Sequence, residues 1–267
     1  MDITNPFKAR LRAGGAVPLG TWLMSGTPST AEALGHAGFD FLVLDMEHVP
    51  IEIGQTADIL RAIALTPARA LVRLPWNDPV TVKRVLDAGA ESIMLPFVQT
   101  AEEARAAVSA AKYPPLGTRG VAAVHRSSGY GAATDYLQRA NDETCVIVQL
   151  ETPEALANMA EIAAVPGLDG IFIGPGDMAA SMGFIGQIGR AEVQETLADA
   201  GRRAGELGIP IGIVGATPEM VGSYIGMGYS FAAIASDLAM MSGRAREVLG
   251  ALGADAAAAA PAGSSAY

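Results

Sequence analysis

The sequence is poor in several residue types: it has one cysteine, three lysines, three histidines and no excess of basic residues. The single cysteine, Cys145, excludes an internal disulfide and a cysteine-based metal cluster, and its apolar neighbours predict that it is a core residue. With 18 basic against 28 acidic residues the formal net charge is −10. The chain therefore lacks the basic surface that binding to nucleic acid or anionic lipid would require.

Long hydrophobic runs are also missing. No apolar run reaches the roughly 18 residues that are needed to span a membrane. The N-terminal residues 1–6 do not combine a cationic start with an apolar stretch, as a secretion signal would. These features predict a cytoplasmic protein that does not bind a membrane.

The absence of certain motifs narrows the chemistry. The three lysines, Lys8, Lys83 and Lys112, all lie away from the ends of the predicted strands, so a Schiff-base lysine is not expected. The sequence contains neither Gly-x-Ser-x-Gly nor Gly-x-x-x-x-Gly-Lys, which excludes the common hydrolase and nucleotide-hydrolase sites.

Half of the residues are hydrophobic and 17% are charged, so a large core is available. Short apolar runs alternate with longer segments of helical periodicity. Strands are predicted at Val17–Trp22, Phe39–Asp45, Ala70–Arg73, Ser92–Leu95, Cys145–Glu151, Gly170–Gly174, Pro210–Val214 and Phe231–Ile234. Helices are predicted at Thr30–Ala37, Ile53–Ala64, Pro79–Ala88, Ala101–Ala111, Pro153–Ala163, Ala191–Leu207, Pro218–Met227 and Asp237–Leu252.

Eight strands that alternate with eight helices predict a parallel sheet covered by helices, and about 250 residues is the usual size of a closed (β/α)8 TIM barrel. We expect one such domain over residues 1–252, followed by a flexible Ala/Gly/Ser-rich tail at 253–267. A doubly wound open sheet is the alternative fold. No Gly-x-Gly-x-x-Gly follows the first strand, which argues against it.

Polar residues gather where the predicted strands end, which is where barrels of this kind carry their chemistry. Glu151 and Asp177 end two successive strands, and carboxylates without histidine or cysteine favour a hard cation such as Mg²⁺ or Mn²⁺. Water and substrate would complete the coordination. The alternative is that Glu151 caps a helix or pairs with an arginine.

His48 follows the second strand in the sequence Asp45-Met46-Glu47-His48, where Asp45 could orient the imidazole and raise its basicity. A base of this kind suits removal of a proton next to a carbonyl group. Arg73 ends the third strand, where its rigid guanidinium suits a carboxylate or an enolate oxygen. A structural histidine and a salt bridge at the barrel rim are the alternative interpretations. For His36, in a predicted helix, we expect a structural role.

Together these residues form an ordered series that runs from Pro18 to Leu249. It comprises Trp22, Asp45-x-Glu47-His48, Arg73, Trp76-Asn77-Asp78-Pro79, Tyr113-Pro114-Pro115-x-Gly117-x-Arg119-Gly120-Val121, Gln149-x-Glu151 and Gly174-Pro175-Gly176-Asp177. The series resembles the HpcH/HpaI family of metal-dependent, pyruvate-using class II aldolases. His125-Arg126 is more similar to the 2-dehydro-3-deoxyglucarate aldolase branch than to the 4-hydroxy-2-oxoheptanedioate branch.

The resemblance implies a barrel of the phosphoenolpyruvate/pyruvate type and a role for each matching residue. His48 corresponds to the catalytic base, Asp87 to the aspartate that supports it with Asp45, and Arg73 to the arginine that stabilises the enolate. Glu151 and Asp177 correspond to the ligands of a divalent metal, Mg²⁺ or Mn²⁺, with Co²⁺ as a further candidate. The implied substrate-binding positions are Gln149, the backbone at Gly176, Asp177, Trp22, His125 and Arg126.

The implied reaction is the reversible cleavage of a 4-hydroxy-2-oxo acid to pyruvate and an aldehyde. The family also forms hexamers with active sites at subunit contacts, so a homo-oligomer is expected. A lyase acting on citryl- or malyl-CoA is the nearest alternative, and the few lysines argue against it. Oxaloacetate decarboxylation and a non-catalytic scaffold are further alternatives. The aldehyde pocket is expected to draw on the loops 125–130 and 214–217 and on a neighbouring chain.

Overall fold

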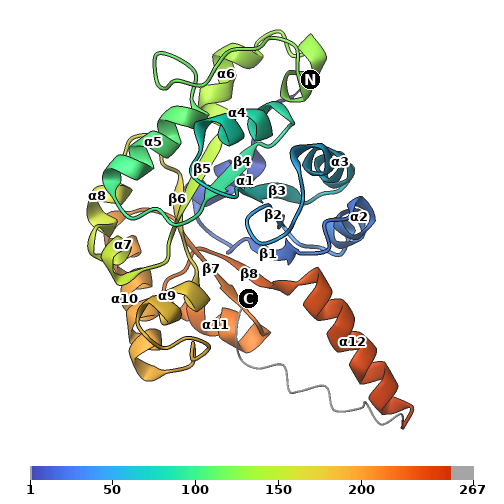
Figure 1. The fold of residues 1–267 in the computed structure, drawn as a ribbon, viewed down its shortest axis with the longest axis vertical. Helices are drawn as coiled ribbons and strands as arrows, with labels where there is room; N and C mark the ends of the chain where they lie inside the picture. The colour runs from blue at the N-terminus through green and yellow to red at the C-terminus, as the bar shows by residue number, and fades with distance from the viewer. Residues whose placement is uncertain (1, 254–267) are drawn as a thin grey trace.

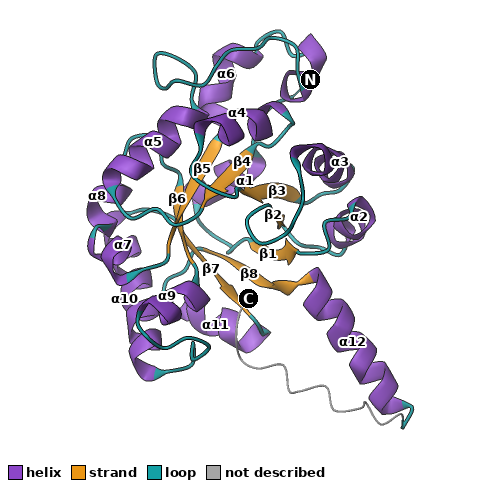
Figure 2. Cartoon of the chain, viewed as in Figure 1, coloured by secondary structure: helices purple, strands orange, loops and turns teal. Residues whose placement is uncertain are grey.

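A computed structural model describes residues 2–253, so the predicted tail lies outside the described residues except for Gly253. Eight parallel strands follow one another around a closed barrel, and β8 pairs with β1 (Figures 1 and 2). The predicted (β/α)8 barrel is therefore confirmed. The strands are β1 (Leu19–Leu23), β2 (Phe41–Asp45), β3 (Arg69–Arg73), β4 (Ser92–Leu95), β5 (Cys145–Leu150), β6 (Gly170–Ile173), β7 (Ile211–Gly215) and β8 (Phe231–Ser236).

Helices surround the barrel and connect its strands (Figure 2). They are α1 (Pro6–Ala13), α2 (Pro28–His36), α3 (Ile53–Ile63), α4 (Pro79–Asp87), α5 (Ala101–Ala111), the 3₁₀ helix η1 (Arg126–Gly131), α6 (Tyr136–Glu143), α7 (Pro153–Ala157), α8 (Met159–Ala163), α9 (Pro175–Ser181), α10 (Ala191–Leu207), α11 (Pro218–Gly226) and α12 (Asp237–Ala251). At the start of several helices, a Ser, Thr, Asp or Asn side chain accepts a hydrogen bond from a backbone N–H group of the first turn. Proline often occupies the first turn of the same helix, as at Asp78 and Pro79 of α4.

Two features of the helices differ from the predictions. The helix predicted over Pro153–Ala163 is two short helices, α7 and α8, that meet at Asn158. The sequence analysis also missed α1, α6, α9 and η1. Each of these is short, and η1 contains left-handed backbone at Gly129 and Tyr130, so a regular apolar period is not available to reveal them.

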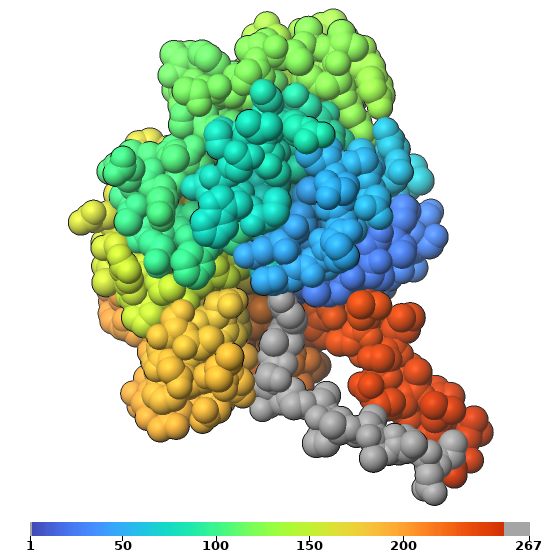
Figure 3. All heavy atoms as spheres, in the orientation of Figure 1, coloured from blue at the N-terminus to red at the C-terminus, as the bar shows by residue number. Residues whose placement is uncertain are grey.

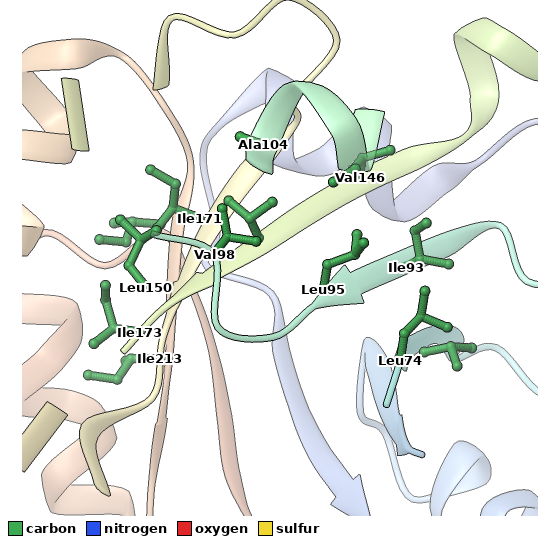
Figure 4. Packing of buried hydrophobic residues seen from close by; sticks show 14 of the residues in the cluster. Leu74, Ile93, Leu95, Val98, Ala104, Val146, Leu150, Ile171, Ile173 and Ile213 are labelled. Atoms are coloured by element: carbon green, nitrogen blue, oxygen red, sulfur yellow. The ribbon is translucent and has the colours of Figure 1, made fainter. Parts of the chain in front are cut away.

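The strands bury alternate residues on two sides, because successive side chains of a strand point to opposite faces. One face packs beneath the surrounding helices, where Leu95, Val146 and Ile171 belong to the same buried cluster as Ala104 of α5 (Figure 4). The other face fills the barrel interior with residues that include Phe41, Cys145 and Phe231. The prediction that Cys145 is a core residue is confirmed, and burial raises the pKa of its thiol to about 12.

Helix α1 closes the N-terminal end of the barrel. Its Phe7 side chain is buried, and the Phe7 ring centroid lies 4.9 Å from that of Phe41 and 5.9 Å from that of Phe231. The barrel interior is therefore sealed by aromatic packing at this end, and its chemistry must face the opposite end.

Helix α12 extends away from the body of the barrel (Figures 1 and 3). Its only buried residue is Asp237, whereas its exposed residues include Leu238, Met241, Val248 and Leu249. Successive members of this set are three, seven and one residues apart, a spacing that places their side chains along one side of the helix. Within residues 2–253, no helix has both the length and the apolar character needed to cross a membrane.

Candidate active site

The predicted site residues continue the inward-facing series of the strands. Asp45 follows Phe41 and Val43 on β2, Arg73 follows Leu71 on β3, and Gln149 and Glu151 follow Cys145 and Ile147 on and just after β5, each two residues further along. Because residues two apart in a strand share a face, these polar side chains cap the apolar filling of the barrel at its C-terminal end.

A cavity of about 430 Å³ opens at this end of the barrel. Its wall contains six of the predicted site residues together with apolar side chains and the loop after β6. The lining residues are Trp22, His48, Arg73, Gln149, Phe172, Gly174, Pro175, Gly176, Asp177, Ala180, Ile185, Gly186, Ile188 and Val214. Arg73 is the only arginine or lysine among them.

Arg73 is held rigidly beneath the cavity. Its Nε and Nη2 donate to the two carboxylate oxygens of Asp45 at 2.9 and 2.6 Å, and its Nη1 lies 2.9 Å from Oε2 of Glu47. The guanidinium also stacks on Trp22, with its central carbon 4.3 Å from the ring centroid. Asp45 and Arg73 are almost fully buried, and their two-point contact holds the guanidinium in one orientation.

His48 lies at the cavity wall and is half exposed. The sequence analysis expected Asp45 to orient the imidazole. The structure instead uses Asp45 to bind Arg73 and to accept from the backbone N–H groups of Glu47 and His48, at 3.0 and 3.4 Å. The carboxylate next to the imidazole is that of Glu47, whose Oε2 is 3.9 Å from Nε2 of His48. Asp45 therefore shapes the loop, and Glu47 lies between the histidine and Arg73.

The two predicted metal ligands face one point. A Cβ atom on Gly174 would lie 2.7 Å from Oε1 of Glu151 and 3.4 Å from Oδ2 of Asp177, so the missing side chain leaves the space between the two carboxylates. Glu151 is buried, and its Oε1 accepts from Nε2 of Gln149 at 3.1 Å. Within the described chain, Oε1 of Gln149 is buried and has no hydrogen-bond partner.

This donor set fits a hard divalent cation, because carboxylate oxygens are the ligands that Mg²⁺ and Mn²⁺ prefer. Among residues 2–253, no three His, Cys, Asp or Glu side chains are grouped as a metal site. The chain would thus offer two carboxylates and leave the other coordination positions to water and substrate oxygens.

Burial and neighbouring negative charge act on these carboxylates. Burial, Asp177 and Glu47 raise the pKa of Glu151 to about 7, against the opposing effects of the Phe97 amide and Arg73. Burial also raises the pKa of Glu47, while Arg73 and His48 act to lower it. A cation placed between Glu151 and Asp177 would remove the repulsion that contributes to the raised pKa of Glu151.

The raised pKa of Glu151 predicts how the metal-free protein responds to pH. Between pH 4.5 and 7, Glu151 keeps its proton in the folded state and loses it in the unfolded chain. Its contribution to folding stability is therefore highest below the unfolded pKa of about 4.5 and falls as the pH rises towards 7. We expect the free energy of unfolding in EDTA to fall by about 3 kcal/mol more in wild type than in Glu151→Gln across this range.

The measurement is urea unfolding in EDTA at pH 4.5 to 8. Glu154→Gln, an exposed glutamate on α7, provides the same change of charge away from the site and should keep the wild-type pH profile. Equal pH profiles for wild type and Glu151→Gln would contradict a raised pKa at Glu151.

Three predicted site residues lie elsewhere in the chain. Asp87 ends α4, and the C-terminal ends of the barrel helices lie at the face opposite the cavity. Its carboxylate accepts from Nη2 of the buried Arg119 at 2.6 Å and lies 3.8 Å from Nε2 of His125. The chain therefore groups Asp87 with His125 and does not bring either to the cavity that contains His48.

Arg126 also lies at this opposite face. Its guanidinium donates to the backbone carbonyls of Leu60 and Ala88, at 3.2 and 3.3 Å, near the ends of α3 and α4. There it lines a second cavity of about 370 Å³ with the loop residues Ser127 and Tyr130. Within one chain, the loop 125–130 therefore does not line the active-site cavity. Val214, from the second predicted loop, does line the active-site cavity.

The cavity also contains residues that the sequence analysis did not select. Ile185 and Ile188 come from the segment between α9 and α10, which has no helical or strand period, and Phe172 is the inward-facing residue two positions before Gly174. Only Phe172 could have been found from the sequence, by extending the strand alternation backwards from the site.

Comparisons with known proteins agree with this architecture. A sequence profile of the family described as HpcH/HpaI aldolase/citrate lyase matches residues 19–243. The 2-dehydro-3,6-dideoxy-6-sulfogluconate aldolase of Pseudomonas putida is 58% identical over 237 residues, which cover 89% of this chain and 93% of that protein. The 4-hydroxy-2-oxo-heptane-1,7-dioate aldolase of Shigella sonnei is 42% identical over 258 residues, 96% of this chain and 98% of that protein.

A solved structure is similarly close. The crystal structure of an HpcH/HpaI aldolase/citrate lyase family protein from Burkholderia cenocepacia J2315 superimposes with a TM-score of 0.91 at 38% sequence identity, and the alignment covers 93% of this chain and 99% of that one. The similarity thus extends over the whole barrel, including every strand that contributes to the cavity.

Proposed function

Since this chain belongs to the HpcH/HpaI aldolase/citrate lyase family, we propose that the cavity at the C-terminal end of its barrel cleaves 4-hydroxy-2-oxo acids to pyruvate and an aldehyde, and catalyses the reverse addition. The chain is an aldolase, a carbon–carbon lyase. The observation that carries the proposed mechanism is the convergence of Glu151 and Asp177 on the space above Gly174, beside Arg73 and His48.

Glu151 and Asp177 would hold the divalent cation. When bound, such a cation polarises the 2-oxo group and stabilises negative charge that develops on its oxygen. Gln149 supports this site in two ways: it donates to Glu151, and its buried carbonyl oxygen faces a cavity in which a ligand could supply a donor. Gly176 and Asp177 lie in the first turn of α9, whose backbone N–H groups suit a carboxylate.

Arg73 and His48 have separate tasks in this proposal. The guanidinium of Arg73 is fixed by Asp45, Glu47 and Trp22, so it offers positive charge to the oxygen of the developing enolate without having to reorganise. His48 takes the proton from the C4 hydroxyl during cleavage, and from the methyl group of pyruvate during synthesis. Its half-exposed position suits a base that exchanges its proton with water between turnovers.

The apolar part of the cavity indicates where the aldehyde lies. Ile185, Ile188 and Val214 form a wall without charge, and Arg73 is the only arginine or lysine in the lining. This argues against the phosphate groups of a CoA thioester. We propose a 2-oxo-3-deoxy sugar acid or a sulfonated relative as substrate. A sulfonate or carboxylate at its far end would need a cation from outside this cavity.

A second copy of the chain is the proposed source of that cation. The apolar side of α12 is exposed, which supports assembly into a homo-oligomer, with a hexamer as the expected form. Asp87 and His125 cannot reach the cavity of their own chain, so any role in supporting His48 requires that they approach it from a neighbouring chain. Arg126 is proposed to meet the far end of the substrate in the same way.

The test of the proposed function is pyruvate release. The candidate substrates are 2-dehydro-3,6-dideoxy-6-sulfogluconate, 2-dehydro-3-deoxyglucarate and 4-hydroxy-2-oxoheptanedioate. Release that needs Mg²⁺ or Mn²⁺, stops with EDTA and returns with added metal is expected, and the fastest substrate identifies the aldehyde. Activity that EDTA leaves unchanged would contradict the metal-dependent mechanism.

Replacing Gly174 by alanine tests the carboxylate pair directly. The new Cβ would collide with Oε1 of Glu151, so we expect Gly174→Ala to weaken Mn²⁺ binding by about ten- to a hundredfold. Gly176→Ala is the matched control from the same turn, because no atom lies within 4 Å of its Cβ position. Calorimetric titration of the metal-free enzyme gives both affinities. Equal affinities in the two variants would place the metal elsewhere.

A further inference from the structure

Phe97 has an unusual backbone conformation. It follows β4 by two residues and has a φ of 54°, in the left-handed region that disfavours residues with a side chain. In the described chain, Tyr130 and Ala235 are the other non-glycine residues with positive φ. Such strain persists only where the surrounding structure maintains it, so it calls for an explanation at this position.

The left-handed conformation brings the backbone of Phe97 to the predicted metal ligand. The N–H of Phe97 donates to Oε2 of Glu151 at 2.9 Å. The next residue, Val98, donates to the backbone oxygen of Gln149 at 3.0 Å. The two bonds join the loop after β4 to the end of β5 on either side of Leu150.

The amide of Phe97 determines which oxygen of Glu151 faces Asp177. Oε2 is occupied by the Phe97 amide, and Oε1 lies on the side of Gly174, 2.7 Å from the position its Cβ would take. The two donors, Phe97 N–H and Gln149 Nε2, approach different oxygens and so fix the plane of the carboxylate. A carboxylate held in one plane loses less freedom when it binds a cation.

The side chain of Phe97 points the other way, to the surface, where it is 41% exposed. Its ring stacks on Trp76, itself 56% exposed, with centroids 6.3 Å apart and planes inclined by 24°. Trp76 belongs to a fixed loop, because Asn77 donates to the Glu103 carbonyl of α5 and Asp78 caps α4. The stack is therefore a contact between a rigid loop and a strained residue.

We propose that Phe97 is a positioning residue for Glu151, and that Trp76 maintains the left-handed backbone through which Phe97 acts. The proposal rests on the proposed function, since it takes Glu151 to be a metal ligand. It assigns an effect on metal affinity to two exposed aromatic residues that do not line the active-site cavity.

The experiment titrates Mn²⁺ into the full-length metal-free enzyme and follows the electron paramagnetic resonance signal of the free ion. We expect Trp76→Ala and Phe97→Ala to weaken Mn²⁺ binding about tenfold. Glycine adopts positive φ without strain, so Phe97→Gly should bind Mn²⁺ within about threefold of wild type although it lacks the ring. Adding Trp76→Ala to Phe97→Gly should have no further effect. Val80→Ala, at an exposed apolar residue on α4, is the control and should match wild type.

Two results would overturn the proposal: a Phe97→Gly variant that binds as weakly as Phe97→Ala, or a Trp76→Ala variant with wild-type affinity. Glu151→Gln separates this failure from that of the proposed function. If wild type binds Mn²⁺ and Glu151→Gln does not, Glu151 is confirmed as a metal ligand. The Trp76 and Phe97 variants then test the positioning role alone. If wild type does not bind Mn²⁺, or Glu151→Gln binds it equally well, the metal site itself fails and this proposal fails with it.

Discussion

Arg73→Lys is expected to lower kcat for pyruvate release by about a hundred- to a thousandfold. The lysine keeps a positive charge next to the buried Asp45, so the fold should be retained. It cannot, however, bind both oxygens of Asp45, approach Glu47 and stack on Trp22 at the same time, as the guanidinium does. Positive charge would remain in the cavity but would lose its fixed position.

Steady-state kinetics at saturating metal, with circular dichroism to confirm folding, test this expectation. Arg69→Lys is the matched control: Arg69 starts the same strand at the opposite end of the barrel, where its Nη1 lies 4.0 Å from Oε2 of Glu91. A kcat within about threefold of wild type for Arg73→Lys would show that charge alone suffices, against the preorganised role proposed here.

His48→Gln is expected to lower kcat by about a hundred- to ten-thousandfold, the range that a positioned general base contributes. Glutamine is similar in size and polar, but it cannot accept a proton at neutral pH. The affinity for Mn²⁺ should stay at the wild-type value, because His48 is not one of the proposed ligands.

Exchange of the methyl protons of pyruvate with D₂O isolates the step assigned to His48, since it needs no aldehyde. We expect this exchange to fall in parallel with kcat. His36→Gln makes the same substitution on the exposed end of α2 and should change neither quantity. Exchange at the wild-type rate in His48→Gln would mean that another group removes the proton.

The strand pattern made much of this site predictable. The alternation along β5 already places Cys145, Ile147, Gln149 and Glu151 on one side, and apolar runs that end in polar residues show which end of the barrel is functional. The fold and the grouping of His48, Arg73, Gln149 and Asp177 around one cavity followed from this regularity.

The positions of the remaining site residues could not be predicted where the sequence has no helical or strand periodicity. The segment from Tyr113 to Asp135 is irregular, so no repeat could show that His125 and Arg126 lie at the far face. Asp87 is a different case. Its position at the end of a predicted helix already implied the face opposite the cavity, and contact with His48 was suggested only by the resemblance to the HpcH/HpaI family. The left-handed backbone of Phe97 has no local signal, because neither glycine nor asparagine marks the position.

The seal that α1 forms has a consequence for the order of events. Phe7 fills the bottom of the barrel, so ligands reach the cavity from the C-terminal end. A ligand next to Arg73 and Gln149 therefore lies deeper than one that contacts the exposed Ile185. Pyruvate should therefore enter before the aldehyde in synthesis and leave after it in cleavage. Such a sequential order makes pyruvate a competitive product inhibitor of cleavage and the aldehyde a noncompetitive one.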